Sequence, residues 1–248
     1  MGRSETVIGN YLAKNKDTFK IASKVGIWKD PNSDKRGINN DAAYMRQELE
    51  ATLRKLNRDY LDLYYIHRLD PTIPVETTMD ALLTFKKEGK IRGIGFSEIS
   101  PATLRRAAAL GPVDAVQSEY SLWTRFAELG LLQTCQELNV AFVPFSPLAR
   151  GMLTDVAPVP DTFADHDIRK TGPRFIEPNF SFNMEYIAQF RALASDAGLS
   201  PSALAIAWCL SRGERFFPIP GTRSRAHLLD WAAASDITLT PDTLSEID

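Results

Sequence analysis

The stretch that decides the fold is residues 61–96, LDLYYIHRLDPTIPVETTMDALLTFKKEGKIRGIGF. It begins and ends in short apolar runs, LDLYYI and IRGIGF, which are typical of buried β-strands. Between them, residues 74–87 begin with Pro and end just before Gly89, the pattern of a helix start and stop. A strand, a helix and a second strand in this order predict a βα unit of a parallel sheet.

The same alternation extends over the rest of the chain. Short apolar runs predict six strands, at residues 18–23, 61–66, 91–96, 113–118, 140–145 and 216–220. Between the first two, apolar residues recur about every 3.6 positions, as in a helix with one buried stripe: Met45, Leu49, Leu53 and Leu56. Further helices are predicted at residues 101–110, 127–138, 184–197, 201–212 and 224–234. No stretch between them resembles a linker, so we expect one α/β domain over residues 1–248.

Residues 154–182 form the one long irregular stretch, with four prolines. A loop of this length in a compact protein either covers a ligand site or is a mobile surface loop. Together with Trp28 and Trp123 it is predicted to shape an apolar pocket, although Trp123 fits core packing equally well.

Composition excludes several classes of protein. The chain has 248 residues, of which 44% are hydrophobic and 24% charged, so it is neither disordered nor fibrous. A net charge of −2 gives no cationic field for nucleic acid or an anionic membrane. The first residues lack the apolar run of a secretory signal, so a cytoplasmic protein is expected. The two cysteines, Cys135 and Cys209, have no metal spacing and are interpreted as packing thiols.

Polar residues at the predicted strand ends carry the candidate chemistry, because functional side chains gather at the carboxyl ends of parallel strands. Lys24 follows the first strand and could lower the pKa of a neighbouring proton donor, although a lysine there is more often a solvated charge. His67 follows the second strand and fits an acid–base or carbonyl-polarising group, with a structural histidine as the alternative.

The segment Gly221-Thr222-Arg223-Ser224 lies between a predicted strand and a predicted helix. Backbone amides at a helix start, with arginine beside them, suit a phosphate, although a simple helix cap is the alternative. No His, Cys or Asp cluster has zinc spacing and no G-x-S-x-G elbow is present, so neither a metal site nor a hydrolase is expected.

Six motifs taken together resemble the strand-end motifs of the aldo-keto reductases. They cover essentially the whole chain in order: IASK (21–24), DLYYIHR (62–68), KIRGIGFSEIS (90–100), VQSEYSLWTR (116–125), PFSPLARGMLT (144–154) and PIPGTRSRAHL (218–228). The resemblance implies a (β/α)8 TIM barrel that reduces aldehydes and ketones with NADPH. Small carbonyl compounds are then the expected substrates, and the oligomeric state stays open.

The resemblance also implies roles for individual residues. Lys24 and His67 match the family's catalytic lysine and histidine. Ser97 and Gln117 match residues that bind the nicotinamide carboxamide, and Glu98 stands where many members have Asn.

A second group matches the family's cofactor-binding segments. Phe145 matches the aromatic residue that stacks on the nicotinamide, and the segment along the pyrophosphate corresponds to Ser146, Pro147, Leu148 and Arg150. The segment at the adenosine 2′-phosphate corresponds to Gly221, Thr222 and Arg223, and Asp230 matches an acidic residue near the adenine. His227 stands where many members have Arg, and Trp231 where Asn is usual, which leaves the preference between NADPH and NADH open.

Two further catalytic groups of the family, an Asp and a Tyr, have no match. The tyrosine of the family segment Y-G-x-G-x-S-E would precede Met1 by two residues, since the chain begins MGRSE. On this alignment we expect only strands three to eight of the barrel, and activity impaired by the loss of the general acid, which costs about 10²–10⁴-fold.

Three readings follow. In the first, the chain is an N-terminally truncated NADPH-dependent carbonyl reductase. In the second, it is a non-catalytic NADP(H)-binding or regulatory remnant of the family. In the third, it is a degenerate fragment that pairs its open sheet edge with another chain.

Overall fold

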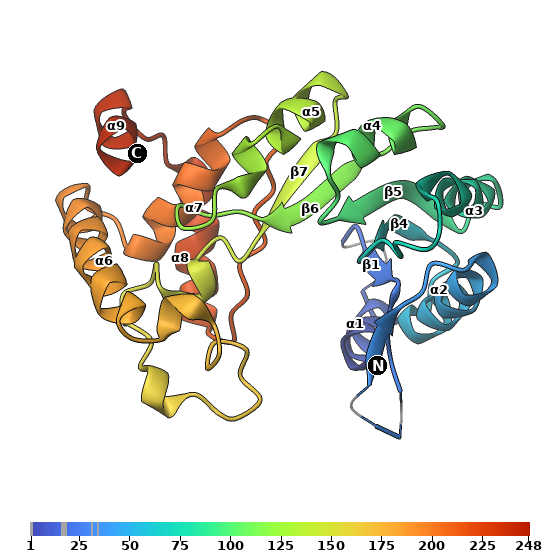
Figure 1. Ribbon diagram of the computed structural model, residues 1–248, viewed down its shortest axis with the longest axis horizontal. Coiled ribbons are helices and arrows are strands. Elements are labelled where there is room, and N and C mark those ends of the chain that lie inside the picture. The colour runs from blue at the N-terminus through green and yellow to red at the C-terminus, as the bar shows by residue number, and fades with distance from the viewer. Residues whose placement is uncertain (1, 16–18, 31, 34) are drawn as a thin grey trace. The chain divides into compact units, whose positions relative to one another are not determined.

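The computed structural model describes residues 2–15, 19–30, 32–33 and 35–248 (Figure 1). Five strands form a sheet in the order β1-β4-β5-β6-β7, with bounds Ala22–Val25, Leu61–Ile66, Ile91–Ser97, Ala115–Glu119 and Ala141–Phe145. The pairs β1–β4, β4–β5 and β5–β6 are parallel, and Tyr65 of β4 lies opposite both Lys24 of β1 and Gly95 of β5. A parallel sheet joined by helices confirms the predicted α/β class.

Nine α-helices lie in the described residues. Their bounds are α1 Arg3–Leu12, α2 Ala42–Leu56, α3 Val75–Lys87, α4 Pro101–Ala108, α5 Leu131–Glu137, α6 Asn179–Asp196, α7 Pro201–Ser211, α8 Arg225–Ala233 and α9 Pro241–Ile247. Short 3₁₀ turns occur at Phe126–Glu128, Ala149–Gly151, Pro160–Thr162, Pro173–Phe175 and Ala234–Asp236. Two predicted helix starts are wrong. α5 begins only after Gly130, whose φ is 106°, and α6 begins five residues early, directly after Pro178.

Two predicted strands also differ from the structure. The first was expected at residues 18–23, but β1 is Ala22–Val25, so Lys24 lies inside the strand; Thr18 falls outside the described residues. The last, at residues 216–220, is reduced to a single bridge between Phe145 and Ile219. Pro218 and Pro220 flank that bridge, and proline has no N–H with which to extend a ladder. An antiparallel hairpin of β2 (Ile27–Lys29) and β3 (Arg36–Ile38) was not predicted.

The chain divides into two compact units. Unit 1 comprises residues 1–118 and 128–142, and unit 2 comprises residues 119–127 and 143–248. In unit 1, α2 contacts β1 and α3 contacts β5. The predicted stripe of α2 is buried, with Met45 and Leu49 at 0% exposure. Each such side chain contributes about 1.5–3 kcal/mol on burial.

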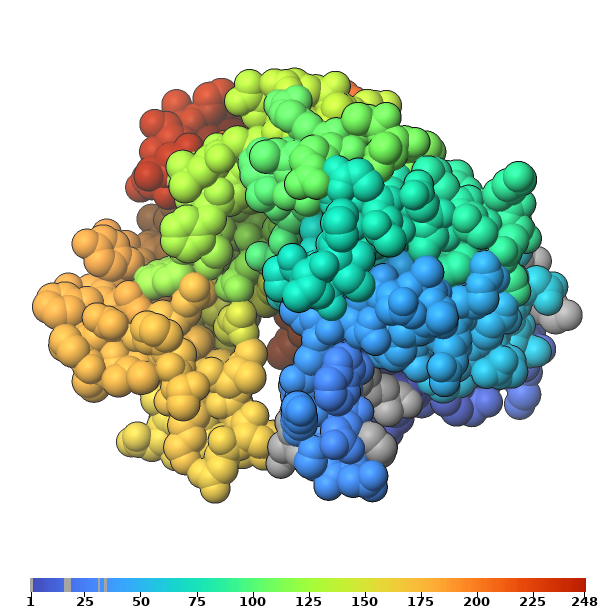
Figure 2. Space-filling model, turned by 45° about the vertical axis from the view of Figure 1, so that its right-hand side comes forward, coloured from blue at the N-terminus to red at the C-terminus, as the bar shows by residue number. Residues whose placement is uncertain are grey.

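Unit 2 has its own apolar core. It gathers side chains from the 3₁₀ turns and helices after β7, including Leu148, Met152, Phe163, Phe175 and Trp231. Helix α7 is buried on nearly all sides, as its almost continuous apolar sequence predicts, and Trp208 on it stacks on Tyr120 with ring centroids 5.3 Å apart. Residues 154–178 and α6 form part of the yellow and orange surface in Figure 2.

No single described helix is long and apolar enough to cross a membrane. Only α6 and α7 taken together reach the required length and hydropathy, and they meet at an angle of 86°.

Candidate functional site

Lys24 lies on β1 of unit 1, and His67 directly follows the adjacent strand β4. Lys24 pairs in register with Tyr65 of β4, and its ammonium nitrogen lies 5.9 Å from the centre of the Tyr65 ring. His67 directly follows β4, and its backbone N–H donates to the carbonyl of Val25 at 2.7 Å. Since alternate residues of a strand face the same side, His67 and Tyr65 share the face of the sheet that carries Lys24.

The charge state of this pair is set by burial and by neighbouring cations. Partial burial of the ammonium group, and then the charge of Arg68, lower the pKa of Lys24. Burial, followed by the charges of Lys24 and Arg68, lowers the pKa of His67 below its usual 6.5. The lowered pKa favours the neutral imidazole of His67, which can donate a hydrogen bond without carrying a charge.

Arg68 is a residue to which the sequence assigned no role. Its guanidinium donates to the carbonyl of His67 at 2.6 Å and to the Ser97 hydroxyl at 3.1 Å. Its own carbonyl accepts from Asn40, which is 1% exposed, at 3.2 Å. The sequence does contain a sign of this role, because Arg68 directly follows His67 at the same strand end.

Three of the four residues predicted to contact the nicotinamide, all except Phe145, also lie in unit 1. Ser97 at the end of β5 and Gln117 in the middle of β6 are buried, at 2% and 7% exposure. Gln117 hydrogen-bonds the Tyr65 hydroxyl, whose pKa burial raises to about 12. Glu98 is exposed, has a φ of 55°, and its N–H donates to the Gln117 carbonyl at 2.9 Å.

Unit 2 contains a cavity of about 800 Å³. Nine of the predicted cofactor-binding residues line it: Phe145, Ser146, Pro147, Leu148, Arg150, Gly221, Thr222, Arg223 and His227. The structure thus brings together two segments separated by some 70 positions in the chain. The bridge between Phe145 and Ile219, with the Ile219 N–H donating to Pro144 at 2.9 Å, holds these segments side by side.

Among the residues of unit 2 that were predicted to bind the cofactor, Asp230 is the one that does not line this cavity. Its carboxylate accepts a hydrogen bond from the Ser200 hydroxyl at 2.6 Å, and Ser200 also caps α7 through the Ala203 N–H. Trp231 does line the cavity, and its ring stacks on His227 with centroids 5.8 Å apart. A flat stacked pair of this kind suits a planar heterocycle.

The cavity has the chemistry that a dinucleotide needs. Arg150 and Arg223 supply guanidinium groups for phosphates, against one aspartate, Asp155, in the lining. Gly221 faces open space, because a Cβ built there would meet no atom within 4 Å. The cavity also adjoins the first turn of α8, whose N-cap is Ser224, and helix N-termini favour anions.

Arg150 is held by a partner that the sequence reasoning did not assign. Its guanidinium donates to the Glu119 carboxylate at 2.9 Å, and Glu119 also lies 3.6 Å from a nitrogen of Arg174. Glu119 is the last residue of β6. Its position, a charged residue at a strand end, is the feature of the sequence that could have pointed to it.

A second cavity of about 540 Å³ lies elsewhere in unit 2. Trp123 lines it together with Leu153, Tyr186 and Phe190, but none of residues 154–182 does, so the predicted combination of Trp123 with the long segment is not found here. Trp28, the other predicted wall residue, is in β2 of unit 1. In the part of the chain that the structure describes, no group of three or more His, Cys, Asp or Glu side chains is arranged to hold a metal.

Comparison with known proteins gives concordant matches. The family model "Aldo/keto reductase family" matches residues 1–248. The chain is 37% identical to "Aldo-keto reductase yakc [NADP(+)]" of Schizosaccharomyces pombe, covering 99% of this chain and 74% of that protein. It is 36% identical to "Aldo-keto reductase str7" of Strobilurus tenacellus, covering 99% and 73%.

Two solved structures are similar over the whole chain. The glycerol dehydrogenase AKR11B4 from Gluconobacter oxydans has a TM-score of 0.92 at 28% identity, covering 100% of this chain and 76% of that one. The thermostable aldo-keto reductase Tm1743, in complex with the inhibitor epalrestat, has a TM-score of 0.78 at 25% identity, covering 100% and 77%. The chain thus spans about three quarters of the length of the proteins it matches.

Proposed function

Because the chain belongs to the aldo/keto reductase family, we propose that it is an NADP(H)-dependent oxidoreductase that reduces aldehydes or ketones to alcohols. The observation that supports this function best is the unit 2 cavity, which is lined by nine of the residues assigned to the cofactor from the sequence. The relative named as an NADP(+) reductase supports the choice of cofactor.

Each set of residues is assigned the part of the cofactor that it would bind. Arg150, with Ser146, Pro147 and Leu148, would bind the pyrophosphate, and Arg223, with Gly221 and Thr222, the 2′-phosphate. His227 and Trp231 would contact the adenine. Phe145, Ser97, Glu98 and Gln117 would contact the nicotinamide. Asp230 would act indirectly, because its carboxylate is engaged by Ser200. When bound, NADPH supplies a hydride to the carbonyl carbon.

Lys24 and His67 would act on the substrate oxygen. Negative charge builds on that oxygen during reduction. Groups that are already oriented toward the oxygen stabilise this charge without having to reorganise. A neutral His67 would donate a hydrogen bond from its ring N–H to the oxygen, and the Lys24 ammonium would stabilise the charge through its field. The alkoxide left by hydride transfer would then take up a proton from water to give the alcohol. The cluster of cations around them, with Arg68, favours an anionic oxygen over a neutral one.

In terms of the barrel, we propose that β1, β4, β5, β6 and β7 correspond to strands three to seven and residues 216–220 to strand eight, all within one domain. The family matches lend no support to an impaired enzyme, and we therefore propose an active reductase.

The first experiment measures NADPH oxidation at 340 nm with benzaldehyde, beside the dissociation constant of NADPH from quenching of indole fluorescence. Lys24→Met and His67→Gln are expected to lower kcat by about 10²–10⁴-fold with little change in NADPH affinity. His166→Gln, an exposed histidine of the long segment, is the matched control and should leave both values unchanged. Tight NADPH binding without turnover by the wild-type chain would contradict the catalytic assignment and favour a binding protein.

A further inference from the structure

The turn that carries Arg150 into the cavity lining has an unusual backbone. Ala149, Arg150 and Gly151 follow one another with φ values of 48°, 59° and 101°. Left-handed conformations are unfavourable for residues with a Cβ, so Ala149 and Arg150 are both strained. Such a turn persists only where its surroundings hold it in place.

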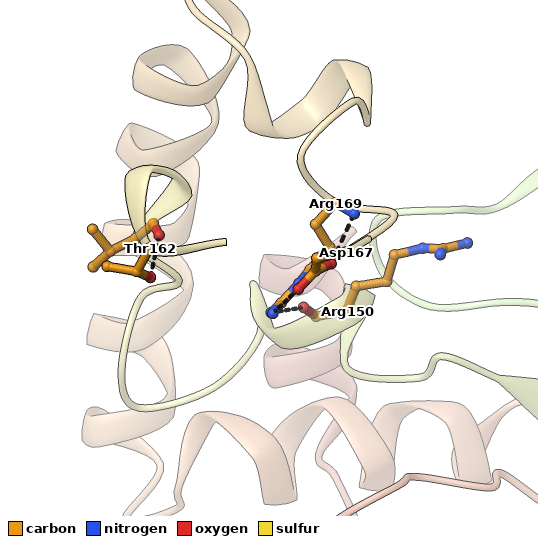
Figure 3. A network of polar contacts seen from close by, with 5 residues as sticks. Arg150, Thr162, Asp167 and Arg169 are labelled. Carbon is orange, nitrogen blue, oxygen red and sulfur yellow. Dashed lines mark hydrogen bonds and ion pairs between the residues drawn. The ribbon is translucent and has the colours of Figure 1, made fainter. Parts of the chain in front are cut away.

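A side chain from the long segment holds this turn from the other side. One terminal nitrogen of Arg169 donates to the Arg150 carbonyl at 3.4 Å. Figure 3 shows the Arg169 guanidinium between that carbonyl and Asp167, while the Arg150 side chain points away from both. Arg169 thus contacts only the backbone of the turn, and it lies outside the described lining of the cavity.

Asp167 fixes the orientation of Arg169. Its carboxylate accepts from Nε and Nη2 of Arg169, the latter at 2.7 Å, and also from the Arg169 backbone N–H at 2.9 Å. These hydrogen bonds lower the pKa of Asp167 to about 2. The carboxylate therefore stays ionised, and the pair stays formed, across the pH range of any ordinary assay.

The pair is anchored to the core of unit 2 by aromatic packing. The Arg169 guanidinium lies 4.2 Å from the centre of the Phe163 ring, and Phe163 meets Phe175 edge to face at 5.5 Å. Both rings are buried in the same apolar cluster as Leu148 and Ala149. The guanidinium is therefore fixed on one face by a ring and at one edge by a carboxylate, which leaves a nitrogen directed at the turn.

We propose that Arg169, held by Asp167 and Phe163, is a positioning residue that fixes the Ala149–Gly151 turn for binding of the dinucleotide phosphates. This rests on the proposed function, because it assumes that Arg150 meets those phosphates. Arg169 acts through the backbone of the turn and does not itself touch the cofactor.

The test compares NADPH affinity in Arg169→Ala and in wild type by fluorescence titration. Loss of a hydrogen bond from a charged donor predicts a dissociation constant about tenfold higher. In turnover, the KM for NADPH should rise by the same factor, while kcat at saturating NADPH and the KM for benzaldehyde stay within about twofold. Arg169→Lys keeps the charge and loses the planar fork, so it should restore the affinity only partly.

Lys170→Ala is the matched control, because Lys170 is the next residue and its ion pair with Asp165 stays within the same segment. It should bind NADPH as wild type does. If Arg169→Ala lowers the Tm strongly, Asp167→Asn is measured in its place, since it loosens Arg169 while keeping its charge and should also weaken binding. Wild-type affinity in a folded Arg169→Ala or Asp167→Asn variant overturns the positioning role and leaves the proposed function standing. Absence of NADPH binding to the wild-type chain overturns both.

Discussion

Three basic residues, Lys24, His67 and Arg68, lie on or next to the adjacent strands β1 and β4 of unit 1, and their interactions affect the chemistry of the candidate site. Besides burial, the charge of Arg68 lowers the pKa of Lys24, and the charges of Lys24 and Arg68 lower the pKa of His67. Arg68 keeps its own position through hydrogen bonds to the His67 carbonyl and the Ser97 hydroxyl. The positive charge of Arg68 thus influences the protonation of both predicted catalytic residues.

This gives a prediction for Arg68→Met. Removing the charge should raise the pKa of His67 toward its usual 6.5 and should also raise the pKa of Lys24. The measurement is an NMR titration of His67, with His166 and His227 as internal references. Arg68→Lys, which retains the charge, should leave the His67 resonance close to its wild-type titration. An unchanged His67 pKa in Arg68→Met would show that burial and the charge of Lys24 set it without Arg68.

The same shift affects stability with a defined sign. Because the pKa of His67 is lower in the folded protein, the unfolded chain takes up its proton first as the pH falls. The contribution of His67 therefore reduces the free energy of unfolding as the pH drops below about 6.5, and Arg68→Met should weaken this dependence.

At the scale of elements, the pairing of β4 with β5 depends on a missing side chain. Tyr65 is 3% exposed and lies opposite Gly95, and a Cβ built on Gly95 would come within 2.4 Å of the Tyr65 ring. The glycine therefore makes room for a ring that also meets Lys24 and Gln117. Strand propensity predicted both strands. A glycine within a strand indicates that another group approaches the backbone closely, but it does not identify that group.

We accordingly expect Gly95→Ala to destabilise the protein by about 1–3 kcal/mol, as overpacking of a filled core does. Denaturant unfolding of Gly95→Ala, Tyr65→Leu and the double variant would measure the coupling. Since the smaller leucine frees the space, the alanine should cost less in the Tyr65→Leu background. Equal costs in both backgrounds would argue against the contact as the cause.

At the scale of the whole molecule, the two compact units each contain one of the two cysteines. Cys135 belongs to unit 1 and Cys209 to unit 2, and they are 3% and 0% exposed. Burial raises the pKa of each thiol to about 12. Their interpretation as packing thiols is confirmed by this burial.

Each thiol can therefore report on the opening of its own unit. In the native protein at pH 8, both should react with a disulfide reagent at least roughly a thousandfold more slowly than a free thiol, because so little thiolate is present. In denaturant both should react fully, and the Cys135→Ala and Cys209→Ala variants assign each signal. Fast labelling of either thiol in the native protein would mean that its unit opens readily.

Local pattern was sufficient for much of the fold. The buried stripe of α2 and the strands at residues 61–66 and 91–96 follow from apolar spacing, and they agree with the structure. Patterns of this kind indicate which face of a single helix or strand is buried in the core. They could not give the hairpin at Trp28, whose strands pair only with each other, nor exclude a strand around Pro218, because those outcomes depend on the partner strand.

For the candidate site, motifs in the sequence identified the residues but not their contacts. The chain alone was enough to predict Lys24, His67 and the segments at Ser146 and Gly221 as site residues, since residue type and order are local properties. Only the tertiary structure decided that Asp230 is engaged by Ser200, that burial and then the charge of Arg68 lower the pKa of Lys24, and that Arg169 hydrogen-bonds the turn of Arg150. The reason is physical: hydrogen bonds, desolvation and charge interactions act over a few ångströms in space, and those neighbours are distant or unmarked along the chain.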